Sequence, residues 1–204
     1  MTTAKLGENI AREWSEDAQA TELRDALQIV ATDAPSGLKM LEKLAANGSS
    51  LAKVYLGNIH LRGKHGVPED GELGESWLRR SAEEGSIEGA YGLASCLLCS
   101  GRTDAAITKY QRLADLKYSP ALFVLGWQYY RGEGVETNLE KSLFYFKLAE
   151  AEGHFHAAHW ISHIYMRSNM GLLAWLRGLT KKIVLTIPFV RATVSYPSSD
   201  RLRR

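Results

Sequence analysis

The stretch that decides the fold is residues 121–135, Ala-Leu-Phe-Val-Leu-Gly-Trp-Gln-Tyr-Tyr-Arg-Gly-Glu-Gly-Val. Residues 52–67, Ala-Lys-Val-Tyr-Leu-Gly-Asn-Ile-His-Leu-Arg-Gly-Lys-His-Gly-Val, repeat its first alanine, second leucine and first two glycines at the same spacing and also end in Gly-Val. A duplicated block of this size indicates a repeat protein before any single helix is assigned.

Four such units begin at Ala52, Ala90, Ala121 and Ala157, at intervals of 38, 31 and 36 residues. These intervals bracket the period of about 34 residues that is typical of helix-turn-helix repeats. The fifth residue after each start is small, which lets a second helix approach closely, and the eleventh is glycine or serine, which suits a helix end. The two sets are Gly57, Ser95, Gly126 and Ser162, and Gly63, Gly101, Gly132 and Ser168.

The second half of each unit also repeats, with an aromatic residue, a small residue four positions later and a helix-capping residue in front. These sets are Trp77, Tyr110 and Tyr145; Ser81, Ala114 and Ala149; and Asp70, Thr103 and Asn138, while Gly85 and Gly153 follow two of the helices. The pattern predicts helix pairs over 51–62 with 71–84, 88–100 with 104–117, and 120–131 with 139–152, and a further first helix over 155–168. Upstream, residues 21–32 and 37–47 are predicted helices, and residues 1–14 a loose helix or frayed end.

The predicted fold is all-α. A single helix pair cannot bury its own apolar faces, so neighbouring pairs must stack. The expected architecture is a short right-handed α-solenoid of stacked helix-turn-helix repeats with a concave side. Residues 1–34 are expected to form an N-terminal helical cap or degenerate repeat, 35–168 the solenoid, and 169–204 an apolar and basic C-terminal cap or tail.

The best-preserved unit reads Gly126-x-x-Tyr129-x-x-Gly132-x-Gly134-Val135, then Asn138-x-x-Lys141-Ser142-x-x-Tyr145-x-Lys147-x-Ala149-x-x-x-Gly153. It resembles the Sel-one-like repeat, a relative of the tetratricopeptide repeat. The first unit has Gly74 where alanine is usual, the second lacks the Gly-x-Gly-Val loop, and the resemblance covers residues 35–168. It implies a scaffold or adaptor that holds protein partners, and it brings no catalytic residues.

Composition narrows the function classes further. The net charge of +2 is too small to indicate a nucleic-acid partner, and the two cysteines suit a reducing compartment. The N-terminus lacks the pattern of a secretory signal, and no run of 18 uncharged apolar residues is present. We expect a cytoplasmic protein, either free or peripheral at the inner face of a membrane, with no enzyme activity, cofactor or small-molecule substrate.

The first helices of stacked pairs line the concave face, and their positions two, six and nine form a stripe there. The stripe comprises Val54, Asn58 and Leu61; Gly92, Cys96 and Cys99; Phe123, Trp127 and Tyr130; and His159, His163 and Met166. Aromatic residues at such positions are typical anchors for a partner, although packing into the solenoid core is the alternative. The predicted groove residues are Asn58, Phe123, Trp127, Tyr130, His159 and His163, with the aromatics as anchors and the others as polar contacts.

Three further motifs, a pair of histidines, a pair of cysteines and two Gly-rich turns, are better explained by structure than by chemistry. His159 and His163 are four residues apart, as in some metal sites, but no acidic residue lies among the neighbouring histidines, so no metal site is predicted. Cys96-Leu-Leu-Cys99 has only the spacing of a redox motif and reads as two small apolar residues on a helix. The Gly-rich turns at 63–67 and 132–135 lack the ending of a phosphate-binding loop.

The C-terminal segment 171–190 departs from the repeat pattern. Leu172, Leu173, Trp175, Leu176 and Leu179 are able to form one apolar helix face, with Arg177, Lys181 and Lys182 nearby. We expect a helix that caps the open end of the solenoid, a basic amphipathic helix that contacts a membrane surface or a partner helix, or a disordered tail. In the second case the membrane contacts are Leu172, Trp175, Leu176, Leu179, Lys181 and Lys182. Residues 183–190 are too short to span a bilayer and are expected to be interrupted at Pro188.

Overall fold

The computed structural model describes residues 13–167 and 171–195, with side chains up to Val184. Within these residues the chain is helical and has no strand. The pairs are α2 (Ala20–Thr32) with α3 (Ala34–Ala46), α4 (Ser50–Arg62) with α5 (Gly71–Glu83), α6 (Ile87–Cys99) with α7 (Thr103–Asp115), α8 (Ser119–Arg131) with α9 (Leu139–Ala151), and α10 (Ala157–Arg167) with α11 (Leu172–Ser195). A short 3₁₀ turn, η1 (Lys64–Gly66), follows α4.

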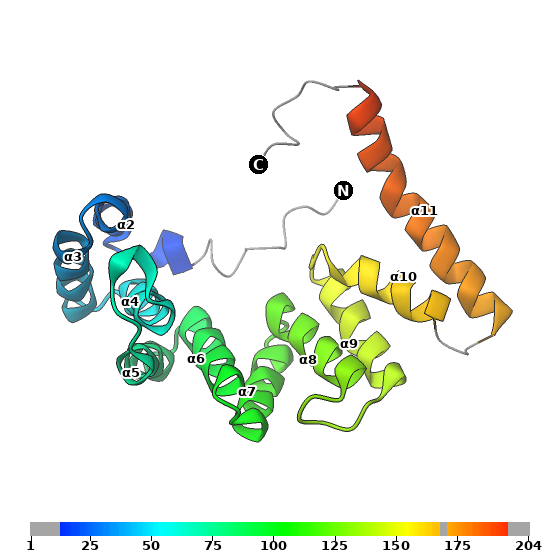
Figure 1. Cartoon of the computed structure of the whole chain (residues 1–204), viewed down its shortest axis with the longest axis horizontal. Coiled ribbons are helices and arrows are strands. Elements are labelled where there is room, and N and C mark those ends of the chain that lie inside the picture. Colours follow the sequence, from blue (N-terminus) through cyan, green and yellow to red (C-terminus); the bar gives the residue numbers. More distant parts are fainter. Residues whose placement is uncertain (1–12, 168–170, 196–204) are drawn as a thin grey trace.

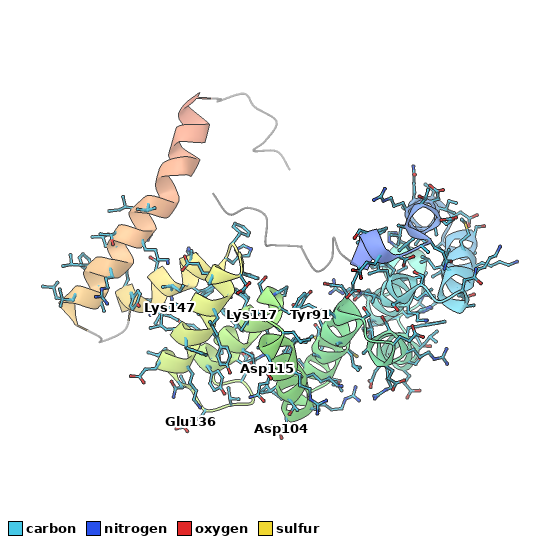
Figure 2. The ribbon with its side chains drawn as sticks, turned by 180° about the vertical axis from the view of Figure 1, so that it is seen from behind. Tyr91, Asp104, Asp115, Lys117, Glu136 and Lys147 are labelled. Carbon is cyan, nitrogen blue, oxygen red and sulfur yellow. The ribbon has the colours of Figure 1, made fainter. Side chains whose placement is uncertain are left out.

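Each helix packs mainly on its neighbours along the chain, and α4 also touches α6. Figure 1 shows the pairs arranged along an arc. The opposite view shows Tyr91 on the inner side of the arc, whereas Asp104 and Glu136 lie at its outer rim (Figure 2). The structure confirms the predicted all-α solenoid, and the predicted helix bounds from 51 to 152 agree with the observed ones to within two residues.

Capping residues start and stop most of these helices. Asp70 and Asn138 accept hydrogen bonds from backbone N–H groups three residues later, both at 2.9 Å, as predicted. Gly63 and Gly132 end α4 and α8 in the left-handed conformation, with φ of +56° and +74°. The predicted cap at Thr103 is wrong, because α7 is preceded by Arg102, which makes no capping hydrogen bond.

Paired helices cross where both carry a small residue. A Cβ added to Gly57 of α4 would lie 3.0 Å from the carbonyl oxygen of Gly74 in α5. In the next well-preserved pair, the Ser142 hydroxyl of α9 donates a 2.7 Å hydrogen bond to the Gly126 carbonyl of α8. The backbones are therefore nearly in contact at each crossing, so Gly74, which departs from the usual alanine, fits its position.

In the middle pair, α6 and α7, the repeat positions fall one residue earlier in the sequence than predicted. Ala94 and Ala106, both fully buried, take the crossing positions in α6 and α7, where Ser95 was expected for α6. Tyr110 likewise aligns with the buried Leu78 and Phe146, and not with the half-buried aromatics Trp77 and Tyr145. The prediction that placed this unit at Ala90 is therefore wrong by one position.

The shift has a local cause at the end of α6. In α4 and α8 the helix-ending glycine is itself the C-cap, whereas α6 has Ser100 as its C-cap and Gly101, with φ of +77°, one residue later. Aligning Gly101 with Gly63 and Gly132 therefore places the start of the middle unit one residue too late, at Ala90 instead of Gly89. The connection from α6 to α7 is also short, residues 100–102, where the other two units use 63–70 and 132–138.

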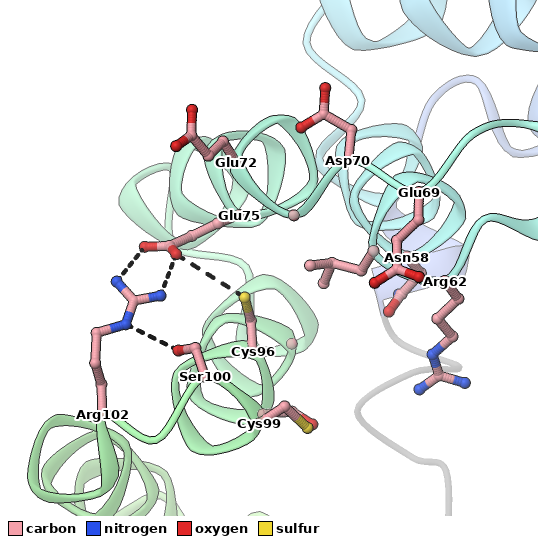
Figure 3. A pocket seen from close by; sticks show the side chains of 14 residues that line it. Asn58, Arg62, Glu69, Asp70, Glu72, Glu75, Cys96, Cys99, Ser100 and Arg102 are labelled. Atoms are coloured by element: carbon pink, nitrogen blue, oxygen red, sulfur yellow. Dashed lines mark hydrogen bonds and ion pairs between the residues drawn. The ribbon is translucent and has the colours of Figure 1, made fainter.

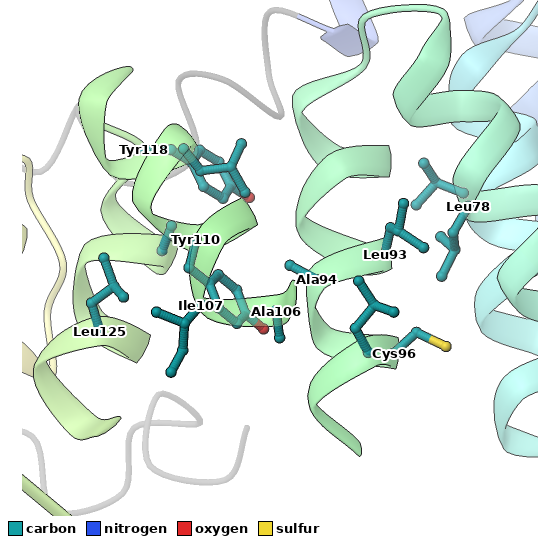
Figure 4. Close-up of a cluster of buried hydrophobic side chains, with 13 residues drawn as sticks. Leu78, Leu93, Ala94, Cys96, Ala106, Ile107, Tyr110, Tyr118 and Leu125 are labelled. Atoms are coloured by element: carbon teal, nitrogen blue, oxygen red, sulfur yellow. The ribbon is translucent and has the colours of Figure 1, made fainter. Parts of the chain in front are cut away.

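Buried side chains form successive clusters along the arc. The middle cluster joins α4 to α8 through Leu78, Leu93, Tyr110 and Leu125, all 2% exposed or less (Figure 4). A second cluster fills the N-terminal pairs, and two smaller ones lie between α8, α9 and α10. Each pair is consequently stabilised by the pairs beside it, as expected for a solenoid.

The first described turn, residues 13–16, is tied to the solenoid. The Glu13 carboxylate accepts a 2.8 Å hydrogen bond from the Ser86 hydroxyl and bonds of 2.7 and 3.1 Å from the next two backbone N–H groups of α6. Trp14 packs edge-on against Tyr55 of α4. The expected loose or frayed end therefore does not extend to Glu13 and Trp14, while residues 1–12 lie outside the described residues.

The C-terminal helix continues the repeat geometry. Gly178 lies 36 residues after Ser142, and the Ser162 hydroxyl of α10 donates a 2.8 Å hydrogen bond to its carbonyl, so α11 packs on α10 as a second helix does. Figure 1 shows α11 extending past the end of α10. The expected interruption at Pro188 is wrong, since α11 runs to Ser195. In residues 13–167 and 171–195 no helix is both long and apolar enough to cross a bilayer.

Substitution at a crossing tests the close approach. In Gly126→Val the new side chain would begin 2.8–3.0 Å from the Phe146 ring, so we expect unfolding free energy to fall by about 1–3 kcal/mol in urea titrations. The control is Gly71→Ala, where an added Cβ meets no atom within 4 Å, and stability should stay equal or rise by about 0.5–1 kcal/mol. Equal losses in both variants would contradict the packing described.

Candidate functional site

An apolar groove of about 510 Å³ lies between α6, α8 and α10. We call it the aromatic groove. Its walls are Tyr91 and Leu98 of α6, Phe123 and Trp127 of α8 and Trp160 of α10, and Gln128 and Tyr110 lie deepest. Three consecutive first helices contribute, so the groove exists only when neighbouring pairs are stacked.

The aromatic walls are held by contacts with one another. Trp127 meets Trp160 edge-on with ring centres 4.4 Å apart, and Phe123 stacks on His154 at 4.1 Å. The Arg131 guanidinium lies 5.6 Å from the centre of the Trp127 ring. These side chains therefore belong to the inter-repeat core along one edge and to the groove along the other.

The predicted groove residues are placed as follows. Phe123 and Trp127 line the aromatic groove, whereas Tyr130 packs on Trp127 and Trp160 beside it. His163 lies among these rings, 5.1 Å from Trp160, while His159 is exposed next to the same ring at 6.0 Å. Asn58 lies apart from them and lines a second hollow.

The sequence reasoning missed several lining residues. Tyr91, Ser95 and Leu98 occupy positions two, six and nine of the middle unit once its start is moved from Ala90 to Gly89, so the correct register would have found them. Trp160 and Gln128 fall outside the three stripe positions. Trp160 and Gln128 reach the groove because of the angle at which neighbouring helix pairs pack. That angle cannot be predicted from the spacing of residues in the sequence.

The second hollow, of about 650 Å³, lies between α4, α5 and α6, and we call it the acidic hollow (Figure 3). Glu75 pairs with Arg102 and, at 2.7 Å, with Arg79; hydrogen bonding to Arg102 is the main reason that the pKa of this carboxyl is lowered. Burial raises the pKa of the Cys96 thiol, which keeps it protonated and unreactive. Cys99 is exposed, and both cysteines are free.

The histidines near α10 differ in their surroundings. Burial, with a smaller effect of His156, lowers the pKa of His154 to about 4. Burial also lowers the pKa of His163, helped by the positive charge of Arg167. Among the residues that the structure describes, no three potential metal ligands lie together.

The outer face of α11 carries the predicted membrane contacts. Leu172 is 71% exposed, and Trp175 and Leu176 are 40% and 42% exposed. Leu179 is half-buried, and Lys181 forms a 2.7 Å ion pair with Glu150 of α9. Lys182 and Arg177 are exposed, so an apolar row with two exposed cations nearby faces outwards.

Stacked helix pairs of this kind define an α-solenoid repeat protein. Residues 50–86 and 119–154 each match the family model "Sel1 repeat", so the chain contains two Sel1 repeats. This family generally mediates protein–protein interaction and is generally non-catalytic. The pair α6–α7 lies between the two matches, in keeping with its short connection and missing Gly-x-Gly-Val loop.

Two solved structures share the fold. A Sel1 repeat protein from Oxalobacter formigenes superposes with a TM-score of 0.68 at 16% identity, covering 84% of this chain and 72% of that one. A protective antigen present in uropathogenic Escherichia coli strains, which displays an SLR fold, gives 0.63 at 18% identity, covering 87% of this chain. The chain spans 44% of that antigen's length.

The low pKa of His154 predicts a pH-dependent stability. Because the folded state favours the neutral imidazole, this contribution is complete above the ordinary histidine pKa of about 6.5 and is lost as the pH falls towards about 4. In urea titrations from pH 7 to pH 4, His154→Gln should lose less stability than the parent chain. The exposed His65→Gln is the matched control; if it flattens the profile equally, His154 is not the group responsible.

Proposed function

We propose that this protein is a scaffold or adaptor that binds a peptide or helix of a protein partner in the aromatic groove. The observation that carries the proposal is the groove itself, with Tyr91, Trp127 and Trp160 as half-buried walls on three stacked pairs. Large aromatic side chains in a partly formed hollow contribute much binding energy at little cost in ordering.

The geometry supports a rigid receptor. The walls are fixed by ring contacts of α8 with α10 and with His154, which precedes α10, so few side chains must be immobilised when a partner binds. Asn58, in the acidic hollow, and His163, beside the aromatic groove, supply polar contacts for the same bound segment. The arrangement holds a partner and makes no bond.

The two ends of the chain have supporting roles in this proposal. Residues 1–34 cap the N-terminal end of the solenoid, and residues 35–168 form the array that carries the groove. Residues 169–204 cap the C-terminal end, a role favoured by the packing of α11 on α10. We propose a cytoplasmic location on the basis of composition.

Truncation of one groove wall tests the proposal. Trp127→Ala should weaken capture of protein partners from a native lysate about tenfold or more, because an aromatic anchor is lost. Phe144→Ala is the control, since Phe144 is 57% exposed on α9 and lines neither hollow. Binding is measured by quantitative pull-down with both variants.

Thermal unfolding of the same variants separates binding from packing. Trp127→Ala should remain folded at the temperature of the pull-down, although the lost contact with Trp160 lowers its melting temperature. If the variant is unfolded there, Trp127 is a core residue and its groove role fails. If Phe144→Ala loses partners instead, the binding surface is on the outer side of the arc.

The exposed apolar row of α11 favours a second candidate function, that of a membrane-surface adaptor at the inner face of a membrane. Leu172, Trp175 and Leu176 would lie among the lipids, and Lys182 would approach anionic headgroups. Lys181 contributes less than the sequence suggests, because Glu150 already holds its ammonium group.

Vesicle flotation tests the second candidate. With vesicles rich in phosphatidylglycerol, the chain should float, and Leu172→Ser with Leu176→Ser should sink, because the buried apolar area is lost. Leu116→Ser, at a leucine 61% exposed between α7 and α8, should float like the parent. Flotation that is the same for all three proteins would remove α11 as an anchor.

A further inference from the structure

Gln128 is an unusual residue for the floor of the aromatic groove. It is 2% exposed, and its amide oxygen Oε1 has no hydrogen-bond partner among the described residues. Leaving a buried acceptor unpaired is unfavourable, so such groups are rare in folded proteins and call for an explanation. Oε1 is itself fully buried, so rotation of the terminal amide is the movement that brings it to the groove, where a donor can reach it.

The surroundings of Gln128 restrict what can satisfy it. Tyr91, Phe123, Trp127 and Trp160 surround the groove with ring faces and edges. A flat apolar group fits between them, and it must carry a hydrogen-bond donor to pair with Oε1. Tryptophan and tyrosine side chains have both properties, whereas phenylalanine has no donor.

The acidic hollow adjoins the aromatic groove, and Ser95 of α6 lines both. Its carboxylates Glu69, Asp70 and Glu72 form no ion pair within the described residues, and Arg62 is the only unpaired cation among its described lining residues. This side of the groove is therefore negative and is complementary to a lysine or arginine side chain.

The two hollows lie on either side of α6 and share Ser95, so a segment that crosses α6 from one to the other covers about one helix-to-helix distance, roughly 8–10 Å. An extended peptide covers that length in about three residues, at roughly 3.3 Å per residue. A basic side chain in the acidic hollow and an aromatic one in the aromatic groove would therefore be about three positions apart.

We propose that the groove recognises a partner segment in which a tryptophan or tyrosine inserts over Gln128 and a lysine or arginine, about three residues away, enters the acidic hollow. The aromatic N–H or O–H donates to Gln128 Oε1. This inference rests on the proposed function and adds to it the chemistry of the partner.

A phage-displayed library of random twelve-residue peptides, panned on the full chain, tests the partner chemistry. We expect enrichment of peptides with tryptophan or tyrosine about three residues from a lysine or arginine, and loss of these peptides on Trp127→Ala. Enriched peptides without that pair would overturn this inference and leave groove binding intact. A library that gives no peptide dependent on Trp127 would overturn both proposals.

The donor to Gln128 is tested with a synthetic peptide from that selection. Replacing its tyrosine by phenylalanine, or its tryptophan by naphthylalanine, should weaken binding to the parent chain about tenfold, because the donor is lost. The same change should have little effect on Gln128→Leu. Gln111→Leu, at an exposed glutamine of α7, is the matched control and should behave like the parent.

Stability gives a second readout for the same variant. Because the free chain leaves Gln128 Oε1 unpaired, Gln128→Leu should melt no lower than the parent while losing its discrimination between the two peptides. If loss of the donor weakens peptide binding equally for the parent and for Gln128→Leu, Gln128 does not accept a hydrogen bond from that donor. If Gln128→Leu melts well below the parent, its amide serves the fold and the inference fails.

Discussion

Two α-helices can cross in near-backbone contact only if each presents a residue with almost no side chain at the crossing. That steric requirement fixes most of this molecule. Gly57 with Gly74, Gly126 with Ser142 and Ser162 with Gly178 set how closely the paired helices approach. The pairs are then thin enough for the next pair to stack, and stacking places three consecutive first helices around one groove.

This requirement also explains how much of the fold the sequence predicts. Small residues recur in the first helices because substitution there is sterically restricted, so helix pairs and their order were predictable from Gly57 and Gly126. The middle unit was misplaced by one residue because Gly101 follows a serine C-cap in α6. The second helix of each unit has a less regular sequence pattern than the first helix. The partner of Ser162 at Gly178 was visible only as a spacing of 36 residues from Ser142 in a segment without other repeat features.

The candidate site was predictable to a lesser degree. Phe123 and Trp127 follow from helical periodicity, since an aromatic stripe on a first helix must face the inner side or the next pair. Trp160 and Gln128 depend on the angle between α8 and α10, which arises from packing across several residues and has no local signature. The buried amide illustrates the point, because glutamine at that position looks like an ordinary surface residue of a helix.

The hydrogen bonds from the start of α6 to Glu13 join residues more than seventy positions apart, whereas the helices pack mainly on their neighbours along the chain. They close the first two pairs and the start of the third into one loop. Amide hydrogens of α2 to α6 should therefore exchange together, through one shared opening, whereas the bonds that hold α11 within the described residues join it to α10 and α9, through Gly178 and Lys181. The N-terminal end of the solenoid is thus bonded across three helix pairs, and the described part of the C-terminal end to the pair beside it.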